Sequence, residues 1–275
     1  MRHLQSLTLA VLAACTAAHA DTTIGVSGAL TGPAASSYAP AVEGLRLYVE
    51  QMNKAGGNRE KVKLVIQDDG GEPSKAATNA KRMLQEGAKV IISASLSSTY
   101  APVIAEAKRS EVPVLFAGAV CPKEVFPPAE KLLFCTTAFT AEYDSRAAVD
   151  YIKEIKGTNV KLGLGAMAIP VSRGGIDFAE DYAKKLGMNV VEKQIIPPNA
   201  SDYLPFATKI RSTEPTVVYS WAPWINQIRT FEGLRKLDWQ NEFITWGHLE
   251  AENELRRVKD KNLFIIGANT LFNEE

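Results

Sequence analysis

Residues Ala88–Gly118, AKVIISASLSSTYAPVIAEAKRSEVPVLFAG, decide the fold class of this chain. The run Val90–Ile92 is short, apolar and β-branched, which is typical of a strand buried on both faces of a parallel sheet. Val103 and Ile104 then begin a helical spacing of apolar residues, and Val112–Phe116 is a second apolar run. The stretch is therefore expected to fold as a strand, a loop, a helix and a second parallel strand.

The loop of this unit, Ser93–Thr99, carries several hydroxyl groups between the end of a strand and the start of a helix. The first turn of a helix has unpaired N–H groups and the positive end of the helix dipole, and ligands of open α/β sheets gather at the carboxyl ends of strands. The loop is thus a candidate anion site. The alternative is that Ser98 or Thr99 only caps the helix.

Length and composition favour a globular protein with a small partner. The 275 residues suffice for about two domains, 46% are hydrophobic and 23% are charged. Lys and Arg together number 31, as do Asp and Glu together. This balance gives no basic surplus for a nucleic acid or an anionic membrane surface, so neither is expected as a partner.

The first twenty residues have the pattern of a signal peptide. Arg2 gives the positive start, Leu4–Ala14 the apolar core, and residues 18–20 a small-x-small cleavage site. No later apolar run is long enough to span a bilayer, so we expect a soluble protein exported to the periplasm. Cleavage after Ala20 is favoured; the alternative is a lipoprotein box that leaves a lipidated Cys15 at the N-terminus.

Two cysteines follow the signal segment, Cys121 and Cys135. In an exported protein an even pair at modest spacing is expected to form a disulfide. The alternative is two buried thiols. Catalytic cysteines are not expected, because the only histidine after the signal segment is His248.

Strands and helices alternate along the rest of the chain, which predicts two Rossmann-like lobes with parallel sheets and helices on both faces. The lobes are expected at 21–139 and 140–268, with a short polar hinge near Ala138–Tyr143. The other expected elements of the first lobe are the strands Thr23–Leu30, Val62–Gln67 and Leu132–Thr137 and the helices Pro40–Ala55 and Pro73–Glu86. Those of the second lobe are the helices Ala141–Lys156, Gly175–Leu186, Ser201–Arg211, Pro223–Leu237 and Glu250–Lys259 and the strands Val160–Met167, Asn189–Ile196, Thr216–Trp221, Glu242–Trp246 and Leu263–Ile266.

Four segments carry a resemblance to a known family. They are IGVSGALTGPAA at 24–35, VEGLRLYVEQMNKAGG at 42–57, VKLVIQDDGGEPSKAATNAKRML at 62–84 and SLSSTYAPV at 95–103. In this order, after an export signal, they resemble the branched-chain amino-acid (Leu/Ile/Val) binding protein family, the type I periplasmic solute-binding proteins of ABC importers. The resemblance implies two lobes joined by three crossovers, which close on a ligand in the cleft between them.

The resemblance also implies where the first lobe contacts the ligand. Ser97 matches the family's serine that takes the ligand carboxylate. Gly118 and Val120 match backbone positions in the loop after the fourth strand. In the family, the loop after the first strand lines the cleft, so Tyr38 and Ser36 are further candidates for ligand contact. Two further candidates are Ser98, beside the carboxylate serine, and Tyr143, at the boundary between the lobes.

The second lobe departs from the family pattern. Arg173 stands where many members have tyrosine, and Trp221 and Trp224 represent an aromatic pair of the family. The acid that holds the ligand ammonium falls at Gly247 or His248, and the nearest acid is Glu250. An arginine and two tryptophans facing a serine-lined helix start suit an anion with a flat or apolar body. The alternative is that Arg173 pairs with a surface acid and one tryptophan belongs to the core.

The resulting expectation is a monomeric binding protein, not an enzyme and without cofactor or metal, that captures a small carboxylate for the permease subunits of an ABC transporter. The carboxylate is amino acid-like or an aromatic acid. The alternative is a ligand-sensing protein of the same fold that acts in signalling. Family members continue past the second crossover, which is expected at residues 269–275. The sequence is therefore expected to be a fragment or a truncated reading frame whose first lobe lacks its closing elements.

Overall fold

The computed structural model describes residues 21–56, 61–118, 120–137, 140–246 and 257–266, without the side chain of Trp224. The expected signal peptide with Cys15, the expected crossover at 269–275 and the positions of Gly247, His248 and Glu250 lie outside these residues. So does most of the expected helix at Glu250–Lys259.

The first lobe is a five-stranded parallel sheet in the order β2-β1-β3-β4-β5. Its strands pair in register, with Val26 of β1 opposite Ile66 of β2 and Ile92 of β3. The strands are β1 (Thr22–Gly28), β2 (Val62–Asp68), β3 (Val90–Ala94), β4 (Val114–Phe116) and β5 (Leu133–Cys135), and the helical elements are α2 (Ala35–Ala55), α3 (Pro73–Gln85), the 3-10 turn η2 (Ser97–Thr99), α4 (Tyr100–Ser110) and the 3-10 turn η3 (Lys123–Val125).

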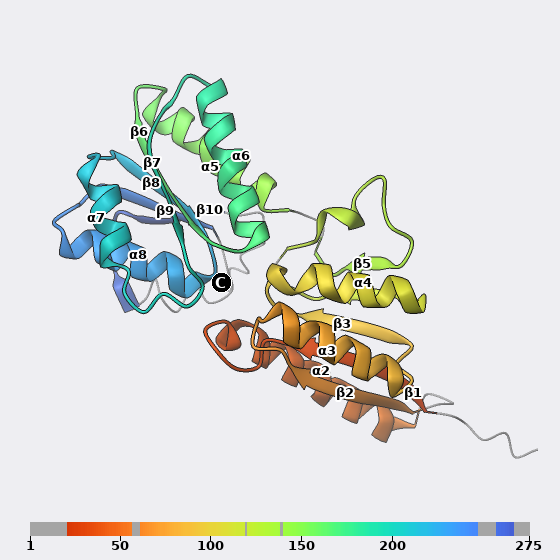
Figure 1. Cartoon of the computed structure of the whole chain (residues 1–275). Helices are drawn as coiled ribbons and strands as arrows, with labels where there is room; N and C mark the ends of the chain where they lie inside the picture. Colours follow the sequence, from red (N-terminus) through yellow and green to blue (C-terminus); the bar gives the residue numbers. More distant parts are fainter. Residues whose placement is uncertain (1–20, 57–60, 119, 138–139, 247–256, 267–275) are drawn as a thin grey trace, which may run out of the picture.

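The second lobe is also a five-stranded parallel sheet, in the order β10-β9-β8-β6-β7. Figure 1 shows it beside the first lobe. Its elements are α5 (Ala141–Lys156), β6 (Lys161–Met167), α6 (Pro170–Lys185), β7 (Asn189–Ile196), α7 (Leu204–Ser212), β8 (Val217–Trp221), α8 (Trp224–Lys236), β9 (Glu242–Trp246) and β10 (Leu263–Ile266).

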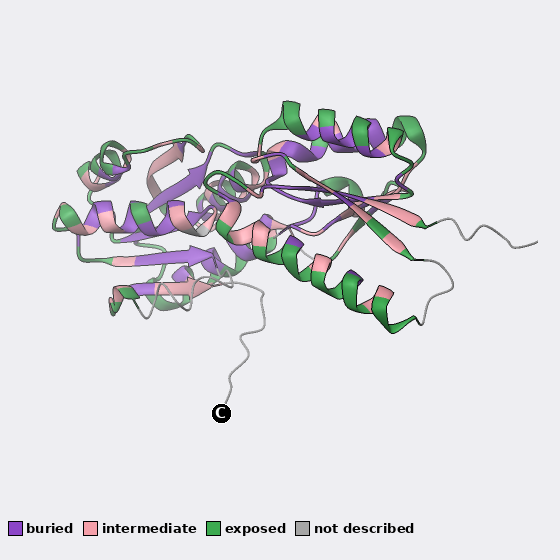
Figure 2. Cartoon of the chain, turned by 90° about the horizontal axis from the view of Figure 1, so that it is seen from below, coloured by how far each residue is buried: buried purple, intermediate pink, exposed green. Residues whose placement is uncertain are grey.

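Alternating strand residues give each sheet two buried faces. In the first lobe Ile91 packs toward α3 and α4, whereas its neighbour Ile92 packs toward Val42 of α2. In the second lobe Tyr219 packs with α5 and α6, whereas Val218 packs with α7 and α8. The buried residues in Figure 2 accordingly follow the sheets and the inner faces of the helices. The α/β fold with two parallel-sheet lobes is confirmed.

Two helices begin earlier than the sequence analysis expected. Helix α2 begins at Ala35, so that Pro40 lies inside it. A proline there removes one helical N–H bond, which the remaining bonds of a long helix tolerate at some cost in free energy. Helix α6 begins at Pro170, which suits the first helical position. Gly175, the expected first residue, therefore lies inside α6. It allows close packing there, because an added Cβ would lie 2.8 Å from the Cβ of Ala141 in α5.

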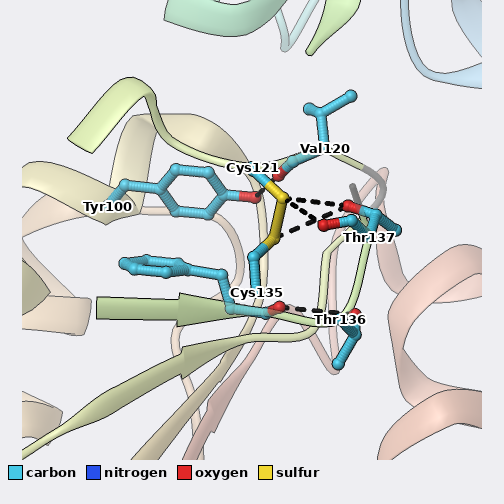
Figure 3. Close-up of a disulfide and its surroundings, with 7 residues drawn as sticks. Tyr100, Val120, Cys121, Cys135, Thr136 and Thr137 are labelled. Atoms are coloured by element: carbon cyan, nitrogen blue, oxygen red, sulfur yellow. Dashed lines mark hydrogen bonds between the residues drawn. A yellow bond between two sulfur atoms is a disulfide. The ribbon is translucent and has the colours of Figure 1, made fainter. Parts of the chain in front are cut away.

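The expected disulfide between Cys121 and Cys135 is present, with the two Cα atoms 5.8 Å apart. Figure 3 shows it beside Thr137, where the chain leaves β5 for the second lobe. The cross-link closes a loop over a sequence separation of 14, so we expect the double variant C121A/C135A to lose about 3 kcal/mol of unfolding free energy. Urea unfolding of the oxidised wild type and of the variant measures this loss. An unchanged midpoint would contradict the expectation.

Candidate functional site

The carboxyl ends of both sheets face each other across an interlobe cleft. Ala34 and Leu96 of the first lobe form one buried cluster with Met167, Ile169 and Ala222 of the second. All five residues lie in or next to the segments that follow strands. This is the part of an open α/β sheet where ligands bind.

Three cavities lie in a row along this contact. A small cavity of about 30 Å³, roughly the volume of one water molecule, lies at the centre; we call it the central cavity. It is lined by Ala34, Ser37, Tyr38, Leu96, Ser97, Tyr100, Val120, Ile169, Val171, Trp221, Pro223 and Trp246. On the β2 side a cavity of about 340 Å³ shares Ala34, Leu96 and Pro223 with it. On the crossover side a cavity of about 240 Å³ shares Ser97, Tyr100 and Val171.

Ser97 joins the two lobes. Its Oγ accepts a hydrogen bond from the backbone N–H of Val171, at 3.2 Å. Ser97 begins η2, which leads directly into α4, and Val171 lies in the first turn of α6. Two helix starts, one from each lobe, therefore meet at this hydroxyl, and the direction of both dipoles favours negative charge between them.

The other hydroxyls of this loop have different partners. Ser98 donates to the carbonyl of Gly71 at 3.1 Å, and Thr99 donates to the carbonyl of Leu96 at 2.8 Å. Thr99 is the residue before α4 and makes no capping bond with its side chain. The capping alternative therefore does not hold for Thr99, and Ser97 is the serine of this loop that lines the central cavity.

Two adjacent aspartates hold the loops around the cleft, and the sequence analysis did not find this role. The carboxylate of Asp69 is fully buried and accepts hydrogen bonds from Ser27 Oγ at 2.7 Å, Ser95 Oγ at 2.5 Å and the N–H of Gly71 at 2.8 Å. Asp68 accepts from the N–H of Leu30, of Thr31 and of Gly70, and from the hydroxyl of Thr31. These bonds join the ends of β1, β2 and β3.

Tyr100 is one of the residues that line the central cavity. It is buried and donates its hydroxyl to the carbonyl of Val120 at 3.0 Å, as Figure 3 shows. Burial raises the pKa of this hydroxyl well above its usual value, so that it remains a donor. Gly118 is needed for this arrangement, because a Cβ there would lie 2.5 Å from the Tyr100 oxygen. Tyr100 is a cavity residue that the sequence analysis missed.

An aromatic wall forms the second-lobe side of the central cavity. Trp221 is buried, its ring stacks on that of Trp246 at 4.5 Å, and its indole N–H donates to the carboxylate of Asp144 at 3.1 Å. Trp246 was not among the expected site residues, although it ends an apolar strand just as Trp221 does. Tyr38 approaches from the first lobe, on the first turn of α2.

Three candidates lie away from the cavities described above. Arg173 is exposed on α6, Tyr143 is 57% exposed on α5, and Ser36 is exposed on α2, where its neighbour Ser37 lines the central cavity. The side chain of Trp224 is outside the described residues.

The residues that line the central cavity in the described part of the chain carry no charged side chain. Within the same part of the chain there is no group of three or more His, Cys, Asp or Glu that could hold a metal ion. None of its helices is long and apolar enough to cross a membrane.

Comparison with known proteins agrees with this geometry. Residues 21–263 match the family described as periplasmic binding protein. This chain belongs to that family. The periplasmic binding protein is 28% identical to Leu/Ile/Val-binding protein homolog 3 of Brucella melitensis over 76% of its own length and 56% of the relative's. The resemblance found in the sequence is confirmed.

Solved structures share the fold of this periplasmic binding protein. A branched-chain amino acid transporter substrate-binding protein of Streptococcus pneumoniae in complex with isoleucine has a TM-score of 0.76 and 17% identity, with 93% of this chain and 73% of that chain covered. A solute-binding protein of an ABC transporter from R. palustris, in complex with 4-hydroxybenzoate, has a TM-score of 0.67 and 17% identity, with 83% and 62% covered. These neighbours are binding proteins, not enzymes.

The periplasmic binding protein spans only part of its curated relatives. The chain covers 56% of the Brucella homologue and 59% of the Leu/Ile/Val-binding protein BraC3 of Rhizobium johnstonii. What the full-length relatives bind, and with which transporter, therefore reaches this chain only as a proposal.

Proposed function

We propose that this periplasmic binding protein captures a small carboxylate between its two lobes, outside the cytoplasmic membrane, and delivers it to an ABC transporter. The observation that carries the proposal is the meeting of Ser97 Oγ and the N–H of Val171 across the cleft. Both are hydrogen-bond donors at helix starts, so a carboxylate placed between them accepts one bond from each lobe. A solute held in this way favours the closed arrangement, because it contacts both lobes.

The apolar part of the solute is proposed to lie against Tyr38, Trp221 and Trp246. These rings line the central cavity. A flat or branched apolar body placed against them would exchange ring contacts within the protein for ring contacts with the solute. The central cavity of about 30 Å³ is smaller than any such body. The solute therefore enters as the lobes separate, and it stays between them when they close.

The same lining favours a carboxylate without an α-ammonium group. A buried ammonium needs an anionic partner. The sequence has Gly247 or His248 where the family has its acid, and the described residues that line the central cavity are uncharged. The carbonyl of Val120, in the loop after β4, already accepts the hydroxyl of Tyr100. Fatty, keto or aromatic acids avoid this cost, as does 4-hydroxybenzoate, the ligand of the R. palustris neighbour.

A pair of ligands with the same body tests this proposal. We expect 4-methylpentanoate, which is leucine without its ammonium group, to bind at least about tenfold more tightly than leucine, because an unpaired buried charge costs several kcal/mol. Quenching of the Trp221 and Trp246 fluorescence reports binding, and calorimetry confirms the stoichiometry. Tighter binding of leucine would contradict the choice of solute but not capture in the cleft. Binding of neither leucine, 4-methylpentanoate nor benzoate would contradict capture of a small carboxylate.

A further inference from the structure

Two tryptophans of the second lobe lie at the ends of neighbouring strands, and the pairing of these strands does not extend to them. Trp221 ends β8 and Trp246 ends β9. The pairing of β8 with β9 ends at Ser220 opposite Thr245, one residue before the tryptophans, and each tryptophan is paired on its other side, with β6 or with β10. The rings stack at 4.5 Å, but stacking tolerates a range of ring angles. Other contacts must therefore fix the two rings relative to each other.

Gln227 supplies such a contact for Trp246. This glutamine lies in the first turn of α8 and is fully buried. Its Oε1 accepts a hydrogen bond from the backbone N–H of Trp246 at 3.0 Å, and its Nε2 donates to the backbone carbonyl of the same residue at 3.5 Å. Both polar atoms of one planar amide are thus bonded to one residue, so the end of β9 is held at two points.

The burial of this amide has to be explained by the bonds that it makes. Moving an amide from water into a protein interior costs free energy, which its hydrogen bonds offset. An apolar side chain could fill the same place without that cost, as Ile228 and Phe231 of the same helix do in the core of the lobe. What an apolar side chain could not do is bond to the backbone of Trp246. The amide of Gln227 is therefore assigned to holding that tryptophan.

The partner ring, Trp221, is held from two other helices. Its indole N–H donates to the carboxylate of Asp144 at 3.1 Å. Asp144 is fully buried in the first turn of α5, where the helix dipole favours a negative charge. The backbone carbonyl of Trp221 accepts the hydroxyl of the buried Ser172 in α6. The two stacked tryptophans are thus held by separate helices, Trp221 by α5 and α6 and Trp246 by α8.

We propose that Gln227 is a positioning residue of the solute site, which holds Trp246 against Trp221 so that the two rings form one rigid wall before the solute arrives. Gln227 does not line the central cavity itself and acts through Trp246. The inference rests on the proposed function, because it concerns the body of the captured carboxylate. A wall that is already ordered lowers the cost of binding, and a planar ring gains most, since its contact depends on the plane of the wall.

Circular dichroism of the full chain tests the positioning of the rings directly, because two stacked indoles give an exciton couplet in the far ultraviolet. We expect this couplet in the ligand-free wild type and its loss in Trp246→Phe, which assigns it to the pair. Gln227→Met keeps the length of the side chain and removes both bonds, so its couplet should be at least about twofold smaller.

Thr230→Val is the matched control. Thr230 is also buried on α8, but its hydroxyl bonds to the carbonyl of Asn226 within the same helix at 2.8 Å. The variant therefore removes a buried polar group from the same helix without touching Trp246, and its couplet should equal that of the wild type. A merely structural role of Gln227 would lower stability in the same way as Thr230→Val and would leave the couplet unchanged.

Calorimetric titration with two acids measures the effect on binding. Gln227→Met should weaken benzoate roughly threefold to tenfold and 4-methylpentanoate less than about threefold, because a branched body depends less on the plane of the wall. Thr230→Val should bind both acids within about twofold of the wild type.

Three results would overturn the proposal: a ligand-free wild type without the couplet, an unchanged couplet in Gln227→Met, or equal weakening of both acids by that variant. If Gln227→Met does not unfold cooperatively, Gln227→Leu replaces it. If the wild type binds neither acid, the proposed function fails, and the couplet alone then decides whether Gln227 positions the rings.

Discussion

The variant Ser97→Ala is expected to bind the proposed carboxylate roughly ten to a hundred times more weakly than the wild type. The hydroxyl of Ser97 is the point where the first lobe meets the N–H of Val171. A hydrogen bond to a charged group contributes about 1.5–3 kcal/mol, which corresponds to this range of affinity. Titration with 4-methylpentanoate or benzoate, followed by tryptophan fluorescence, measures the effect.

The neighbouring serine supplies the control for this experiment. Ser98 has the same side chain and lies on the same turn, but its hydroxyl bonds to the carbonyl of Gly71. Ser98→Ala should therefore change the dissociation constant by less than about threefold, because it removes one neutral hydrogen bond away from the solute. Equal losses in the two variants would show that the turn as a whole matters and that Ser97 has no special part in binding.

The variant Asp69→Ala is expected to destabilise the protein by about 3 kcal/mol. It deletes a fully buried carboxylate and leaves the hydroxyls of Ser27 and Ser95 and the N–H of Gly71 without their acceptor. The loss should appear as a lower urea midpoint and as a thermal midpoint about 6–12 °C lower, given the size of the chain. Asp69→Asn keeps the shape and one acceptor oxygen, so its urea and thermal midpoints should lie between those of the wild type and of Asp69→Ala.

Asp177→Ala is the matched control for this second variant. It also removes one aspartate, but Asp177 is 57% exposed on α6 and pairs with Lys193 at the surface. Its loss should cost less than about 1 kcal/mol. A surface variant as damaging as Asp69→Ala would mean that the strand ends are not joined through the buried carboxylate.

The sequence predicts the fold well because the buried strands and the disulfide depend on local patterns. Val90–Ile92 is apolar on both faces, and it forms β3 at the centre of its sheet. The helix boundaries were harder to predict at proline and glycine, because each of these residues occurs both at helix ends and inside helices. Pro40 was expected to start a helix and lies inside α2, and Gly175 was expected to start a helix and serves as a close contact inside α6.

The candidate site could be predicted only in part, because side-chain direction depends on contacts between segments distant in the chain. Ser97 and Trp221 do line the central cavity. Arg173 follows the correct strand but lies on the outward face of α6. The role of Asp69 needs three strands side by side, and that of Tyr100 needs the loop of Val120 within reach. No local motif contains this information.

The bond between Ser97 and Val171 sets what any occupant of the cleft has to replace. The hydroxyl and the N–H group are each other's partners, so a solute that bonds to the N–H of Val171 takes it from the hydroxyl. The gain in free energy is therefore the difference between the bonds that are made and the one that is broken, which is smaller than the sum of the new bonds.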